Sequence, residues 1–463
     1  MAGLFQGLEL GKRALISHQY ELTTAGHNMA NVNTPGYSRQ RAVLAATDPM
    51  ISTVGRFGSG VRIASVNQAR DMFLTAQYRQ GSDQLNRWGA RQKAMNEVEN
   101  IFQEPSSSGF SKTLDSFFSA WQTLSQNPES SAGRAAVREQ ASLVVNAFHQ
   151  MSNSLSDLQK SLDDQVGGMV TKINGLAANI AEINRQVARA ELGGEKANDL
   201  RDRRDQAIDE LSQYADVHVI EMKNGVARVF IGSMELVEQN SSNRLATMTT
   251  GNGDQTQTTV VWQGGTSPVT VAGGELAGLI ESRDQLLPQY RAQLDELAAG
   301  IVQEVNTLHR TGYGIDGATG RDFFTATGIT ADTISVSADV TNDLNKIGAS
   351  LSGGPGDNAV ALSIANLQKT LTMDGASSTF NDFYGKIVGA VGVRSSEAND
   401  AKTNADLVLQ QIEFSRQSIQ GVSLDEEMAN LIAAQHAYDA AARIITTMDS
   451  AINTVINDMG VGR

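Results

Sequence analysis

The apolar positions near the start of the chain recur every seven residues. A narrow apolar stripe of this period is typical of a helix that packs along one other helix. The pattern predicts a helix over residues 4–32, about 44 Å long. The main row is Leu8, Leu15, Leu22 and Met29, and the offset row contains Leu4, Ala25 and Val32. The expected interface residues of this helix are Leu4, Leu8, Leu15, Leu22, Met29 and Val32.

The same repeat returns in the last segment of the chain. It predicts a second helix, over residues 423–459, that supercoils in a left-handed sense against its partner. Ser423 precedes three acidic residues and is the expected N-cap. The main row is Leu424, Leu431, Tyr438, Ile445, Ile452 and Met459, and the second row contains Met428, Ala442 and Ile456.

The two ends of the chain carry opposite charge. Residues 1–47 have four basic and two acidic groups, a net +2, whereas residues 424–463 have two basic and six acidic groups, a net −4. Opposite charge favours pairing of the two predicted helices with each other. We therefore expect a coiled coil made from the two termini.

Helical periodicity also dominates most of the middle of the chain. Only seven prolines occur, and none lies between Pro128 and Pro268 or after Pro355, so long helices can run without interruption. Extended structure is expected over residues 41–66. The apolar spacing predicts helices over residues 68–102, 114–124, 132–213 with an interruption at 191–199, 275–309, 359–371 and 380–420.

A stretch rich in Val and Thr, residues 214–273, has the composition of short strands separated by glycine turns. The predicted strands are VHVIEM (217–222), ARVFIG (227–232), TTVVWQ (258–263) and PVTVAG (268–273), with one more at TISVS (333–337). The predicted fold is thus mainly α with a small β insert: paired N- and C-terminal coiled-coil helices, a long helical-bundle domain and an outer small all-β domain.

The expected domain boundaries follow from these changes of pattern. Residues 1–40 and 421–463 form the terminal coiled-coil core domain, residues 41–213 and 274–420 the helical body, and residues 214–273 the outer β domain.

Composition excludes several classes of function. The chain has no cysteine, which excludes disulfides, thiol nucleophiles and cysteine-ligated metals. A formal net charge of −14 disfavours binding to nucleic acid or to an anionic membrane. No apolar run is long enough for a transmembrane helix, and the N-terminus lacks the pattern of a secretory signal peptide. We expect no nucleic-acid partner, no membrane insertion and no cleaved signal.

Motifs for catalysis or metal binding are weak throughout. The six histidines form no metal-binding pair, and GYGIDG (312–317) follows a helix instead of a strand, so it reads as a connector and not as a dinucleotide site. The charge cluster DLRDRRDQ (199–206) has the spacing of a solvated helix face, although Asp202 and Asp205 could in principle do acid–base chemistry. We therefore predict no catalytic, cofactor-binding or metal-binding residue.

The string ANVNTPGYSRQ (30–40) marks the end of the first helix. Pro35 disfavours a helical conformation at Thr34, and Gly36 can take a positive φ. The string predicts a corner at which the chain leaves the terminal helix. Its motif residues are Asn31, Asn33, Thr34, Pro35, Gly36 and Tyr37.

Five segments together resemble the flagellar axial proteins, which comprise the rod, hook and hook-associated proteins. They are TAGHNMANVNTPGYSRQRA (24–42), GSGVRIASVNQARDMFLTAQYR (58–79), ANDLRDRRDQAIDELSQ (197–213), GGELAGLIESRDQLLPQ (273–289) and GVSLDEEMANLIAAQHAYDAAARIITTMDSAINTVIN (421–457). The matches reach from one end of the chain to the other, and their combination is far more specific than any one of them.

The resemblance implies a structural protein of the bacterial flagellum and not an enzyme. It implies a junction protein that links hook to filament by self-assembly through its terminal helices, without a cofactor. The implied partners are a ring of identical copies, the flagellar hook protein, a second hook–filament junction protein, an export chaperone and the flagellar type III export apparatus. The implied location is extracellular, at the hook–filament junction. Two alternatives stay open: a hook or distal rod protein, and an axial protein with an enzymatic outer insert.

Overall fold

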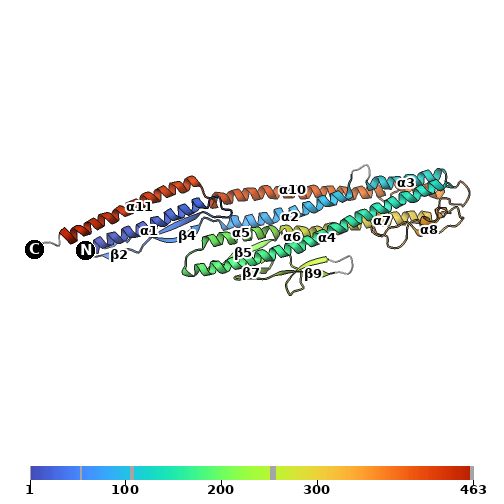
Figure 1. Cartoon of the computed structure of the whole chain (residues 1–463). Coiled ribbons are helices and arrows are strands. Elements are labelled where there is room, and N and C mark those ends of the chain that lie inside the picture. Colours follow the sequence, from blue (N-terminus) through green and yellow to red (C-terminus); the bar gives the residue numbers. More distant parts are fainter. Residues whose placement is uncertain (1, 53–54, 105–108, 251–256, 459–463) are drawn as a thin grey trace.

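The computed structural model describes residues 2–52, 55–104, 109–250 and 257–458. The molecule is long, and its first and last helices lie side by side at one end (Figure 1). It is mainly helical with small antiparallel sheets, as the periodicity predicted.

One end of the molecule, which we call the arm, contains both terminal helices. Helix α1 (Ala2–Ala30) packs along α11 (Leu424–Asn453), so the predicted pairing of the two ends is confirmed. A π-helical turn (Thr454–Asp458) continues α11. Strands β1 (Gln40–Ala46) and β4 (Val61–Gln68) form an antiparallel pair against α1, and β2 (Met50–Ser52) pairs with β3 (Gly55–Phe57).

The rest of the chain, which we call the body, is a helical bundle built around long antiparallel helices. The longest, α4, runs from Ser131 to Ala190. The other body helices are α2 (Met72–Phe102), α3 (Phe110–Gln126), α5 (Asn198–Tyr214), α6 (Gly274–Glu281), α7 (Leu287–His309), α8 (Ala338–Asn342), α9 (Ala359–Asn366) and α10 (Phe380–Gln420). A π-helical turn (Ser282–Leu286) joins α6 to α7, and 3-10 turns lie at Glu191–Gly193, Leu344–Lys346 and Leu367–Lys369.

A single hydrophobic core fills the body among the described residues. Its buried members extend from Ala90 to Val391, and none of them belongs to the arm. The arm and the body therefore do not share a hydrophobic core.

The β insert differs in detail from the prediction. Strands β5 (Val217–Glu221), β6 (Ala227–Ile231) and β10 (Gln257–Trp262) lie where expected. The strand predicted at residues 268–273 is wrong, because only an isolated bridge joins Pro268 to Val261, and residues 333–337 likewise form only a bridge. Three strands were missed: β7 (Met234–Glu238), β8 (Ser241–Ser242) and β9 (Leu245–Thr250).

The β strands form two small sheets beside α4. Strands β5 to β8 pair in sequence order, and β9 pairs with β10. Their buried residues, including Val229 and Leu236, belong to the same core as the helices. The segment predicted as a strand at 268–273 is irregular chain, and its two valines, partly buried, pack against this core.

His309 ends α7 inside an aromatic cluster at the far end of the body. Its ring lies 6.4 Å from that of Trp121 and 5.4 Å from that of Phe323. Nε2 accepts the Gly348 backbone N–H at 2.9 Å, and Nδ1 lies 2.8 Å from the Arg321 carbonyl oxygen. Both contacts are satisfied by a neutral ring with its hydrogen on Nδ1. This lone histidine is therefore structural.

His309 is expected to make the body sensitive to acid. Burial lowers the pKa of this imidazole from 6.5 to about 4. The imidazole pKa in the folded chain is below its pKa in the unfolded chain. The free energy of unfolding therefore decreases as the pH falls from the unfolded pKa toward the folded pKa. Between pH 7 and pH 5, the free energy of unfolding contributed by this imidazole decreases by about 2 kcal/mol. Urea unfolding of the wild type and His309→Gln at both pH values measures it. An equal pH dependence in the two proteins would contradict the assignment.

Candidate functional site

Small residues of α1 face larger apolar side chains of α11 in the interface between the two helices. A Cβ added at Gly11 would lie 2.9 Å from Cγ1 of Ile445, and one added at Gly7 would lie 2.9 Å from Sδ of Met448. Ala25, Ala434 and Ala441 are buried in the same interface region. Glycine and alanine at these positions let the two backbones approach each other closely.

The seven-residue rows that face the partner helix are only partly those predicted. On α1 the facing positions include Gly7 and Asn28, three repeats apart, and on α11 they include Glu427 and Ala434. The predicted main row of α1 is one residue further on, which turns it by about 100° around the helix. Leu8, Leu15, Leu22, Met29 and Val32 are half-buried at the edge of the interface.

The predicted rows of α11 divide in a similar way. Met428 and Ile456 are 51% and 57% exposed, so the second row is wrong as part of the intramolecular interface. Leu424, in the main row, is also exposed at 48%. The other main-row residues, Leu431, Tyr438, Ile445 and Ile452, are half-buried. The side chain of Leu4 and the whole of Met459 lie outside the described residues.

The corner is where the sequence placed it. Helix α1 ends at Ala30, the Thr34 N–H donates to the Asn31 carbonyl at 2.9 Å, and Gly36 has a φ of +76°. Asn33, Thr34, Pro35 and Gly36 are exposed, while Asn31 and Tyr37 are half-buried. Ser423 caps α11 as predicted, accepting the Glu426 N–H.

Tyr37 ties the corner back to the helix that it leaves. Its hydroxyl donates to Asn28 Oδ1 at 2.7 Å, and its ring packs edge-on against His27. Burial, followed by the nearby carboxylates, raises the pKa of this phenol above its ordinary value. Just beyond, the Arg39 N–H donates to the Gln420 carbonyl at 2.8 Å. The segment that follows α1 and the segment that precedes α11 therefore lie next to each other.

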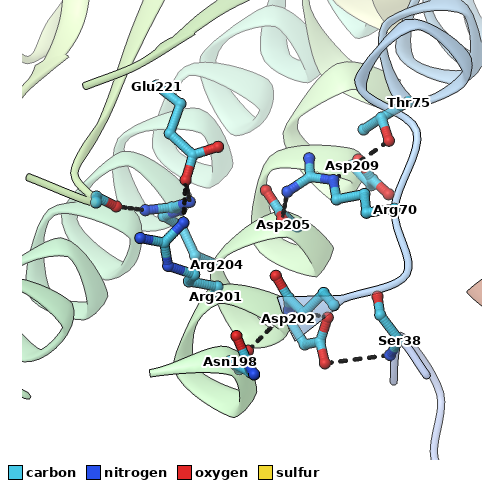
Figure 2. A network of polar contacts seen from close by, with 12 residues as sticks. Ser38, Arg70, Thr75, Asn198, Arg201, Asp202, Arg204, Asp205, Asp209 and Glu221 are labelled. Atoms are coloured by element: carbon cyan, nitrogen blue, oxygen red, sulfur yellow. Dashed lines mark hydrogen bonds and ion pairs between the residues drawn. The ribbon is translucent and has the colours of Figure 1, made fainter. Parts of the chain in front are cut away.

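A set of buried polar contacts, which we call the polar joint, connects the arm to the start of α5. Asp202 accepts the Ser38 N–H at 3.1 Å (Figure 2). It also accepts the Gln68 side-chain amide at 2.7 Å. Gln40 donates to Asp199 at 2.8 Å. Burial raises the pKa of the Asp202 carboxyl to about 6.

The next turns of α5 form ion pairs that link α5 to two other helices of the body. Asp205 pairs with Arg70 and Arg79, and Asp209 accepts from Arg79 Nε at 2.7 Å and from Arg416 Nη1 at 2.6 Å. These ion pairs attach α2 and α10 to α5. They are mostly buried, so each arginine has lost much of its hydration and depends on its carboxylate partner.

An adjacent face of α5 contacts the β insert and the turn that precedes α5. Arg201 pairs with Glu191 and Glu221, and the fully buried Arg204 reaches Glu221 and the Gly225 carbonyl. The interpretation of residues 199–206 as a solvated face is therefore wrong. The spacing of Asp and Arg in this segment is the same for a solvated and for a buried helix face, so it gave no signal of these internal ion pairs.

The polar joint borders a groove of about 890 Å³, which lies between the segment that follows α1 and the segment that precedes α11. Its charged side chains are mostly engaged in the ion pairs above, so it presents no free nucleophile paired with a base. Within the part of the chain described, no group of three His, Asp or Glu side chains is arranged to hold a metal ion. The described helices also include none that is long and apolar enough to cross a membrane.

Comparison with known proteins gives this architecture a family. The chain is 32% identical to flagellar hook-associated protein 1 of Bacillus subtilis, and the match covers 100% of both chains. The chain belongs to the flagellar hook-associated protein 1 family. It is therefore a structural component of the flagellum, a hook–filament junction protein outside the cell, and not an enzyme.

Other comparisons agree with membership of the hook-associated protein 1 family. The chain is 27% identical to flagellar hook-associated protein 1 of Salmonella typhimurium, over 95% of this chain and 97% of that protein. Residues 95–324 match the flagellar hook-associated protein FlgK helical domain, and residues 416–459 match the flagellar basal body rod FlgEFG protein C-terminal family. The flagellar hook junction protein FlgK of Burkholderia pseudomallei shares the fold, with a TM-score of 0.67 and 18% identity over 74% of this chain and 100% of that one.

Proposed function

We propose that this hook-associated protein assembles as a ring of identical copies through its arm. The ring sits between the flagellar hook protein and a second hook–filament junction protein. The chain reaches this site through the flagellar type III export apparatus with an export chaperone and without a cleaved signal peptide. In this proposal residues 1–40 and 421–463 are the assembly domain, residues 41–213 and 274–420 a helical domain that also includes strands β1 to β4 of the arm, and residues 214–273 the outer domain.

The observation that carries the proposal is that the arm has a seven-residue repeat of apolar residues, some of which stay exposed on its surface. On α11, Met428 and Ile432 are 51% and 50% exposed. On α1 the leucine row is only half-buried. Contiguous exposed apolar residues on a soluble protein usually mark a protein interface. In an assembly of identical copies, the neighbouring arm is the surface that matches this repeat.

Ile432→Asp tests this assignment. The side chain is half-exposed in the single chain, so the arm should keep its helix content, whereas a carboxylate in an interface between copies would be buried without a partner. We expect incorporation at hook tips to fall to background, as seen by electron microscopy of hook tips with and without the protein.

The matched control is Thr447→Asp, which adds the same charge at an exposed polar position of the same helix, outside its seven-residue apolar rows. It should assemble normally. Normal incorporation of Ile432→Asp would remove this face of α11 from the assembly interface.

A further inference from the structure

The arm contains a buried polar cluster in an otherwise small and apolar interface. Glu427 is 2% exposed and accepts from Arg39 Nε at 2.6 Å and from Asn28 Nδ2 at 3.0 Å. Asn28 is also buried: its amide donates to the Gln40 carbonyl at 2.9 Å, and its Oδ1 accepts from the Gln40 backbone N–H at 2.9 Å and from the Tyr37 hydroxyl at 2.7 Å. The cluster thus joins α1, the strand that leaves the corner, and α11.

Hydrophobic burial alone does not select the observed rotation of α1. Each terminal helix carries two competing rows one residue apart: Gly7 to Asn28 against Leu8 to Met29 on α1, and Glu427 to Met448 against Met428 to Ile456 on α11. Rotating α1 by one position would place Leu8, Leu15 and Leu22 in the interface and bury more apolar area, whereas the same rotation of α11 would bring in Gln435 and Asp449 with Met428 and Ile456. The observed interface instead places the glycines and Asn28 of α1 against Ile445, Met448, two alanines and Glu427 of α11.

The polar cluster favours the observed rotation of the helices over the rotation by one position. A rotation or slide of α11 would withdraw Glu427 from both donors, leaving the buried Arg39 charge with only the exposed Glu426 as a partner. A buried polar residue in a coiled coil is known to specify register and orientation at some expense of stability.

We propose that the Asn28–Arg39–Glu427 cluster sets the register between α1 and α11. It holds the small-residue rows together inside one chain and leaves the large apolar rows available to neighbouring copies. The second part of this statement rests on the proposed function, whereas the register itself concerns the single chain only.

Cross-linking in the purified full-length chain measures the register. The natural chain has no cysteine, so a Gly11→Cys and Ile445→Cys pair provides the only thiols. A Cβ at Gly11 lies 2.9 Å from Cγ1 of Ile445, close to where a cysteine sulfur would stand, so this parent pair should form an intramolecular disulfide.

The deciding variant adds Arg39→Met and Glu427→Leu to this pair. Replacing both partners with apolar groups avoids an unpaired buried charge, so circular dichroism should show the parent's helix content. We expect the cross-linking rate to fall at least five-fold. Glu426→Gln, at the exposed partner of the same arginine, should leave the rate unchanged.

Three outcomes would overturn the proposal. The first is a parent pair that does not cross-link, and the second is a double variant that keeps both its helix content and its cross-linking rate. The third is a double variant that loses helix content, because the cluster would then be a source of stability and not of register. None of these measurements requires a flagellum. A failure here is therefore distinct from a failure of Ile432→Asp to block incorporation.

Discussion

Deleting residues 1–32 or residues 424–463 is expected to abolish incorporation at hook tips while the body stays folded. The hydrophobic core of the body contains no residue of either segment, so its packing does not depend on the arm. Each deletion removes one of the two terminal helices, and the remaining helix would expose its apolar rows because a single helix of this length is marginal in water.

Two measurements check the deletions. Circular dichroism and thermal unfolding should show a cooperative transition for the body close to that of the full chain. Electron microscopy should show no trimmed protein at hook tips above the background of cells that lack it. Equal incorporation of full-length and trimmed protein would refute the role of the arm, and loss of the cooperative transition would refute the independence of the body.

Asp209→Ala is expected to have the largest effect of any single substitution at the ion pairs of α5. Its carboxylate is the partner of both Arg79 Nε and Arg416 Nη1, so the change leaves two mostly buried guanidinium groups short of an acceptor. Breaking a buried ion pair in this one-sided way costs about 3–5 kcal/mol. Urea unfolding of the purified chain measures the loss.

The neighbouring Glu210 provides the control for Asp209. It is exposed on the same helix, and Glu210→Ala should change the unfolding free energy by less than about 0.5 kcal/mol. The double variant Asp209→Ala with Arg416→Ala should lose less than the sum of the two single changes, because the pair is coupled. Additive losses would mean that Asp209 and Arg416 do not act as a pair.

The ion pairs of α5 show why part of the site could not be predicted. The spacing of Asp and Arg over residues 199–206 is compatible with a solvated face and with a buried one, since both are amphipathic helix surfaces. Arg79 and Arg416, which neutralise Asp209, are 130 and 207 residues away in the chain. Nothing in the local pattern states which distant segment supplies the partner of a charge.

The terminal helices show a similar division at finer scale. The seven-residue rows, the charge difference between the ends and the Thr-Pro-Gly corner each predicted a feature that the structure contains: two paired helices and a turn after the first. The rows did not predict which of two neighbouring stripes faces inward. On α1 a leucine row was expected in the interface, and glycine, Ala25 and Asn28 occupy it; on α11 Ile445 of the predicted row does face α1, together with Met448, two alanines and Glu427.

The sequence by itself determined the long helices, the corner after the first of them, the mainly α fold and the family, because periodicity, caps and turn residues act over a few positions and family motifs are read directly. Only the tertiary structure decided the rotation of each helix and the partner of each buried charge. A rotation of one residue preserves the local pattern, and its free energy depends on groups such as Arg39 and Asn28 that approach Glu427 only in the folded chain.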